Sequence, residues 1–122
     1  MTTSRRQRRV AEFVKEEMGE LLARHVHDPR LQWVTITDAQ VTPDLAIARV
    51  YYSIIGDADQ LQQAQEGLER AKGYLRRELA ARLRLRVVPQ LEFHQDAALQ
   101  QGRRIDDLLD KIHREDAGDA DS

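Results

Sequence analysis

The sequence predicts an α+β domain in which helices pack against one face of a three-stranded sheet. Residues 5–26 and 60–83 carry apolar side chains at steps of three or four residues, the pattern of amphipathic helices. Residues 33–41 and 45–55 are rich in Val, Ile, Thr and Tyr, and after Leu83 the apolar spacing shortens to two residues, which is typical of strands. With 122 residues, the chain fits a single domain with one core.

The first helix is expected to begin after Ser4, whose hydroxyl can accept a hydrogen bond from a free backbone N–H. Its first turns carry four arginines: Arg5, Arg6, Arg8 and Arg9. Cations near a helix N-terminus are disfavoured by about 0.3–1 kcal/mol each, so this segment is either frayed or used for binding. The helix should end at HDPRL, residues 27–31, because Pro29 disfavours helical backbone at the residue before it.

The segments 33–41 and 45–55 are predicted to form an antiparallel hairpin. The separating tripeptide TPD has turn chemistry, since Pro43 fixes φ and Asp44 can accept local hydrogen bonds. In the second strand, the even-numbered residues from Ala46 to Ile54 make the more continuous apolar face. We therefore assign the even-numbered residues to the core.

The segment after GDAD should be helical, with Asp57 or Asp59 as its N-cap. A glycine inside a helix costs about 1 kcal/mol relative to alanine, so two helices meeting at a kink near Gly73 are expected. Residues 83–93 then alternate as a half-buried strand, which would place Arg84 and Arg86 on one strand face. Because Pro89 has no N–H, that strand should lie at a sheet edge or contain a bulge.

The C-terminal region differs from the rest in charge. Residues 106–122 hold seven acids and two bases, a local charge of −5; because the whole chain carries −2, the first 105 residues carry +3. Ile105, Leu108, Leu109 and Ile112 have the spacing of a short amphipathic helix. We expect a domain at 5–95, a helical extension at 96–113 and an acidic, disordered tail at 114–122.

Several kinds of chemistry have no support in the sequence. There is no cysteine, which excludes disulfides and thiolate metal sites and suits a reducing, cytoplasmic location. No apolar run approaches the roughly 20 residues that span a bilayer. The chain has no GxSxG, GxxxxGK[ST] or GxGxxG motif, and its four histidines have no metal-ligand spacing. The sequence therefore predicts a protein without catalytic residues, cofactor or metal, which does not enter a membrane.

A basic cluster is the strongest functional signal in the chain. Between Arg70 and Arg86, seven residues are basic and only Glu78 is acidic. The basic residues of this cluster are Arg70, Lys72, Arg76, Arg77, Arg82, Arg84 and Arg86. With the four amino-terminal arginines they make eleven bases, a pattern typical of phosphate-backbone binding. Aromatic residues are only 5% of the chain, so binding by shape and phosphate contact is favoured over base stacking.

Four segments together resemble the bacterial ribosome-binding factor A (RbfA) family in content and order. They are DPRL, VTITDAQVTPDLAIARVYYSI, AKGYLRRELAARLRLRVVPQLEF and GRRIDDLLDKI, and the resemblance spans residues 5 to about 113. It implies a KH-like fold of the type II arrangement, α-β-β-α-kink-α-β with a mixed sheet. A kinked helix pair with an Ala-x-Gly step replaces the usual GxxG loop in this family. That step corresponds to Ala71, Lys72 and Gly73.

The resemblance also implies a function. It implies a non-enzymatic assembly factor that binds the small (30S) ribosomal subunit and its 16S rRNA late in maturation, near the site of 5′-end processing. A GTPase that helps to release it and a role in growth in the cold are further implications. The Ala71–Gly73 step and the basic residues around it would face the rRNA. We expect a monomer.

Two other classes of function compete with this interpretation. A protein-interaction module without direct RNA contact would bind through the apolar side of the C-terminal helix or a sheet edge, and salt would affect it little. A small hydrolase would need converging polar groups, and the sequence offers no such set. Sensitivity of binding to salt separates the first alternative from RNA binding.

Overall fold

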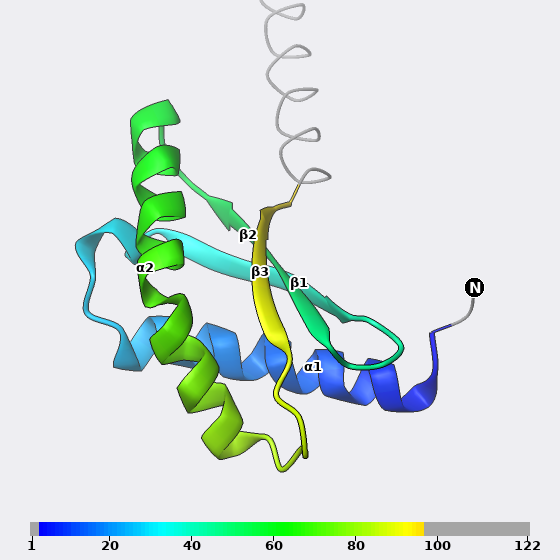
Figure 1. Ribbon diagram of the computed structural model, residues 1–122. Coiled ribbons are helices and arrows are strands. Elements are labelled where there is room, and N and C mark those ends of the chain that lie inside the picture. The colour runs from blue at the N-terminus through cyan, green and yellow to red at the C-terminus, as the bar shows by residue number, and fades with distance from the viewer. Residues whose placement is uncertain (1–2, 97–122) are drawn as a thin grey trace, which may run out of the picture.

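The structure is a computed structural model and describes residues 3–96. The helix expected around Ile105–Ile112 and the acidic tail at 114–122 lie outside these residues. The elements occur in the order α1 (Arg5–Glu20), a π-helical turn (Leu21–His25), a 3₁₀ turn (Pro29–Leu31), β1 (Val34–Val41), β2 (Ile47–Ile54), α2 (Ala58–Arg82) and β3 (Gln90–Gln95), shown in Figure 1.

The three strands form one mixed sheet in the order β1-β2-β3. β1 and β2 pair antiparallel, with Val34 opposite Ile54, and the TPD turn joins them as predicted. β2 and β3 pair parallel, beginning with Ile47 opposite Gln90. A parallel pair needs a long crossover, and α2 provides it. The predicted α+β class with a three-stranded mixed sheet is confirmed.

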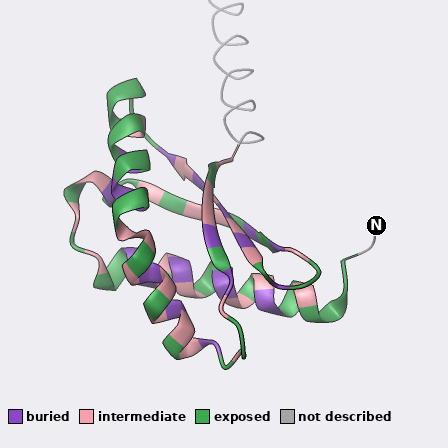
Figure 2. Cartoon of the chain, viewed as in Figure 1, coloured by how far each residue is buried: buried purple, intermediate pink, exposed green. Residues whose placement is uncertain are grey.

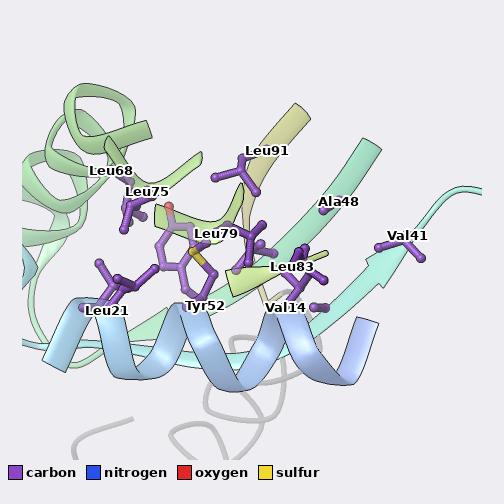
Figure 3. Close-up of a cluster of buried hydrophobic side chains, with 14 of the residues drawn as sticks. Val14, Leu21, Val41, Ala48, Tyr52, Leu68, Leu75, Leu79, Leu83 and Leu91 are labelled. Atoms are coloured by element: carbon purple, nitrogen blue, oxygen red, sulfur yellow. The ribbon is translucent and has the colours of Figure 1, made fainter. Parts of the chain in front are cut away.

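The core lies between the helices and one face of the sheet (Figures 2 and 3). Burial alternates along β2, and its even-numbered residues from Ala48 to Ile54 are buried, as the sequence predicted. Val14 of α1, Leu21 of the π-helical turn, and Leu75 and Leu79 of α2 pack with them in the same cluster. One apolar layer therefore fixes where both helices sit on the sheet.

Side-chain caps define where both long helices begin. The Ser4 hydroxyl accepts from the Gln7 N–H at 3.1 Å, and the Gln7 side chain accepts from the Ser4 N–H at 3.0 Å. Asp57 and Gln60 repeat this arrangement at the start of α2, with distances of 2.9 Å and 2.8 Å. Each pair satisfies two backbone groups that a helix end would leave without partners.

The expected division into two helices at Gly73 is absent, because α2 is one continuous helix through this residue. Figure 1 shows the helix bending along its length without interruption. Buried Leu68, Leu75 and Leu79 all come from α2 and pack in the same core. Packing of this apolar stripe holds the helix together at a residue that weakens it locally.

The strand predicted at 83–93 is shorter than expected, since β3 begins only at Gln90. Residues 83–89 form the connection from α2, which we call the α2–β3 loop. The parallel pairing starts at Ile47 opposite Gln90, so the residues before Gln90 have no partner strand. Pro89 lies directly before β3, which is an edge strand of the sheet. We expected an edge strand because proline has no backbone N–H to donate to a second neighbouring strand.

Candidate nucleic-acid interface

The C-terminal half of α2 and the α2–β3 loop carry the basic cluster. Four of its seven basic residues are exposed: Arg70, Arg77, Arg84 and Arg86. The other three are partly buried: Lys72, Arg76 and Arg82. Within the predicted Ala-x-Gly step, Ala71 is partly buried and Gly73 is exposed. The basic cluster therefore combines exposed side chains, which are free to meet a ligand, with partly buried side chains, which also contact the rest of the fold.

Arg76 ties α2 to the α2–β3 loop. Its Nε donates to the Pro89 carbonyl at 3.2 Å, and its Nη2 donates to the Val88 carbonyl at 2.9 Å. Both acceptors are neutral, and no carboxylate in residues 3–96 forms an ion pair with Arg76. The guanidinium therefore fixes the loop and leaves its positive charge uncompensated by a nearby acid.

Arg82 faces α1 and is not part of the exposed set. Its Nε lies 4.0 Å from Oε1 of Glu17, and its side chain is 26% exposed. Its Nη1 is buried and has no hydrogen-bond partner in the described part of the chain. The structure thus places Arg82 between the two helices, beside the Glu17 carboxylate.

A hollow of 500 Å³ lies between α2 and the α2–β3 loop. We call it the loop pocket, and its lining residues are Gly73, Arg76, Arg77, Ala80, Arg86, Val87 and Val88. Three of them carry guanidinium groups and none carries a carboxylate. Arg84 and Arg86 were expected on one strand face; both belong to the loop instead, and Arg86 faces the pocket.

Salt bridges compensate the charges at the other end of the basic cluster. Nζ of Lys72 lies 2.8 Å from Oε2 of Glu69. Arg30, which the sequence interpretation did not include, forms a two-pronged pair with Asp28, with Nη2 to Oδ2 at 2.7 Å. Hydrogen bonds from Arg30, first from its side chain and then from its backbone N–H, lower the pKa of Asp28. A second hollow there, lined by Arg30, Arg70 and acids of α2, has mixed charge.

The amino-terminal arginines form a separate basic group. All four are exposed on the first two turns of α1: Arg5, Arg6, Arg8 and Arg9. This end of α1 lies beside the β1–β2 turn, where the Gln7 side chain donates to the Val41 carbonyl at 3.2 Å (Figure 1). The end of α2 approaches α1 at Glu17, about 12 Å further along the helix axis than Arg9. The two groups therefore sit on different parts of the surface.

Other kinds of site are absent from the part of the chain that the structure describes. No three metal-ligating side chains within residues 3–96 come together as a cation site. None of the helices in this range has the length and apolar composition that crossing a membrane requires. The remaining charged network, Arg49, Glu92 and His94, joins β2 to β3 on the sheet face opposite the core.

The fold and the basic cluster define a small α+β domain with an arginine-lined hollow beside its crossover helix. The chain matches the family model described as ribosome-binding factor A over residues 6–109, and it belongs to this family.

Solved structures agree with this assignment. The crystal structure of ribosome-binding factor A from Thermus thermophilus is similar, with 27% identity, a TM-score of 0.66 and coverage of 73% of this chain and 93% of that one. The solution NMR structure of a Thermotoga maritima protein, a putative ribosome binding factor A, has 31% identity and a TM-score of 0.68, covering 79% and 92%. A Thermus thermophilus RbfA homology model, fitted into a cryo-EM map of a 30S–RbfA complex, has 29% identity and a TM-score of 0.59, covering 70% and 89%.

Proposed function

We propose that this protein binds the small ribosomal subunit and acts there as an assembly factor through contact with 16S rRNA. Membership of the ribosome-binding factor A family supports the partner, as does the similarity to the RbfA model fitted into a 30S complex. The observation that carries the RNA contact is the loop pocket, where three arginines gather without an acid. Such a surface attracts the phosphate backbone, whose charge dominates protein affinity for nucleic acids.

The proposed mechanism is occupancy. The protein would hold an immature rRNA conformation, or prevent early use of the subunit, without making or breaking a bond. Action late in maturation, near 5′-end processing, and release by a GTPase belong to the same proposal. The KH-like domain is residues 5–95, and the protein acts as a monomer in the cytoplasm. Exposed Arg70, Arg77, Arg84 and Arg86 are the direct phosphate contacts in this account.

Co-sedimentation with purified small and large subunits across a salt series tests this function. We expect selective binding to the small subunit that weakens as salt rises. The variant with Arg77→Gln and Arg86→Gln should bind less tightly, and each lost phosphate contact should reduce the salt slope by roughly 0.7–0.9. The double variant with Lys15→Gln and Arg24→Gln is the charge-matched control, because both residues are exposed and lie outside the basic cluster. Equal binding to both subunits, or to neither, would contradict the proposal.

One observation favours a second candidate, a protein-interaction surface. Trp33 is 55% exposed and Ile55 is 70% exposed, and they flank the paired residues Val34 and Ile54 at one end of the hairpin. Neighbouring exposed apolar side chains of this kind often contact another protein. Binding that persists at high salt and is lost with Trp33→Ala would support this candidate over RNA contact.

A further inference from the structure

One end of the sheet carries an apolar surface that the described fold leaves in water. Three large apolar side chains of residues 3–96 are exposed, and two of them, Trp33 and Ile55, lie at this end. Trp33 comes directly before β1 and Ile55 directly after β2, so both adjoin the paired residues Val34 and Ile54. We call the side chains of Trp33 and Ile55 the hairpin-end surface.

The hairpin-end surface belongs to the sheet face opposite the core. Val34 packs against the core cluster and Ile54 is buried, so both face the helices. Side chains alternate between the two faces along a strand, which directs their neighbours Trp33 and Ile55 to the other face. Exposed fractions of 55% for Trp33 and 70% for Ile55 agree with this placement. In the described part of the chain, both long helices pack on the core side and leave this surface open.

The described chain ends beside this surface. β3 runs parallel to β2, so both strands point toward the hairpin-end surface (Figure 1). The Asp96 N–H donates to the Tyr52 carbonyl at 2.7 Å, and the Asp96 carboxylate accepts from Oγ1 of Thr37 at 2.6 Å. Tyr52 precedes Ile55 by three residues, a rise of about 10 Å along a strand. The direction of β3 therefore carries the chain toward the hairpin-end surface.

The sequence beyond Asp96 contains a segment that fits this surface. Its apolar residues recur at steps of three or four and its charged residues fall between them: Ile105, Leu108, Leu109 and Ile112, with Asp106, Asp107, Asp110 and Lys111. A helix of this sequence, which lies outside the described residues, would have one apolar and one charged side. Residues 97–104 can span up to about 28 Å when extended, which is more than enough to reach the surface.

We propose that the apolar side of residues 105–112 packs on the hairpin-end surface of the same chain. Apolar side chains would leave water on both sides of this contact, and the broad ring of Trp33 offers most of the area. The acids on the other side of the segment would stay in water, where their charges are hydrated.

This inference does not rest on the proposed RNA contact, because β3 separates the hairpin-end surface from the loop pocket. It gives the surface of the second candidate function an occupant from the same chain. A partner protein would have to displace residues 105–112 before it could bind Trp33 and Ile55.

The fluorescence of Trp33 tests the proposal, because it is the only tryptophan in the chain. The experiment compares the full-length protein with its Leu108→Ser/Leu109→Ser variant and measures the emission maximum and the quenching by acrylamide. Loss of the apolar side should move the emission to longer wavelength. The quenching constant should rise about twofold, since the packed segment would cover about half of the exposed ring.

The matched control is Asp107→Ser/Asp110→Ser, which makes the same replacement on the charged side of the same segment. Its emission and quenching should equal those of the wild type. Ile55→Ser removes part of the surface, so it should raise quenching more in the wild-type background than in the leucine variant. Equal effects in the two backgrounds would contradict direct contact between the segment and the surface.

The remaining outcomes are equally decisive. Identical quenching in the wild type and the leucine variant would overturn the proposal and leave the surface open to another protein. Protection of Trp33 that grows with protein concentration would also overturn it, since a second copy would then supply the segment. A wild-type protein that does not bind small subunits would overturn the proposed function and leave this inference standing.

Discussion

Arg76 and Arg77 are neighbours on α2, yet alanine at position 76 should reduce stability, whereas alanine at position 77 should leave it nearly unchanged. The Arg76 guanidinium makes two hydrogen bonds, at 3.2 Å and 2.9 Å, that close the α2–β3 loop. A hydrogen bond from a charged group contributes about 1.5–3 kcal/mol to stability. Because Arg76 is partly exposed, each of its two hydrogen bonds should contribute about 1.5 kcal/mol or slightly less. We therefore expect Arg76→Ala to reduce the free energy of unfolding by about 2–3 kcal/mol.

Urea unfolding followed by circular dichroism measures this loss, because the linear extrapolation gives the free energy of unfolding directly. Arg77 is exposed and forms no hydrogen bond or ion pair with the described residues, so Arg77→Ala should change stability by less than about 0.5 kcal/mol. Arg76→Lys keeps the charge but loses the guanidinium that donates both hydrogen bonds. Its free energy of unfolding should lie between those of Arg76→Ala and Arg77→Ala. Equal unfolding midpoints for Arg76→Ala and Arg77→Ala would refute the tethering role.

Two more predictions concern the packing and the charges around the 3₁₀ turn. Gly67→Val should cost about 1–3 kcal/mol through overpacking, because even a Cβ at this position lies 3.0 Å from Cδ2 of Leu31. Urea midpoints should show a much smaller loss for Gly19→Val, and equal losses would contradict the packing argument. Hydrogen bonds from Arg30 lower the pKa of Asp28, so their contribution to stability is present above a pH of about 4 and is lost as pH falls through the lowered pKa. Arg30→Gln should therefore be less stable than wild type at pH 7, with the gap narrowing below a pH of about 4; a gap that is constant with pH would rule this out.

Local chemistry made much of the fold predictable. Ser4 and Asp57 cap their helices through a residue three positions later, and such pairs are visible in the sequence. The core face of β2 followed from simple alternation, since residues at even positions share one side of a strand. Pro29 likewise indicated a break after the first helix, and the structure has a separate 3₁₀ turn that begins at this residue.

The errors came from contacts between distant residues. The apolar alternation after Leu83 is the same as that of a strand, but a strand also needs a neighbour to pair with. β2 begins at Ile47, and Ile47 pairs with Gln90, so β3 begins at Gln90. The expected division into two helices at Gly73 did not occur, because core packing outweighs a local cost of about 1 kcal/mol. The Arg76 hydrogen bonds reach backbone carbonyls, which any residue provides, so the sequence contains no signal for them.

The measurement that tests the central claim most directly is cleavage of rRNA by hydroxyl radicals generated at a single site on the bound protein. The chain has no cysteine, so one introduced residue can carry the iron chelate. Ala81→Cys and Gln62→Cys place it at exposed positions about 28 Å apart along α2. RNA contact through the basic cluster predicts strong cleavage of small-subunit rRNA from Ala81→Cys and weak cleavage from Gln62→Cys. The reverse pattern, or no cleavage from Ala81→Cys in a protein that still binds, would contradict this account.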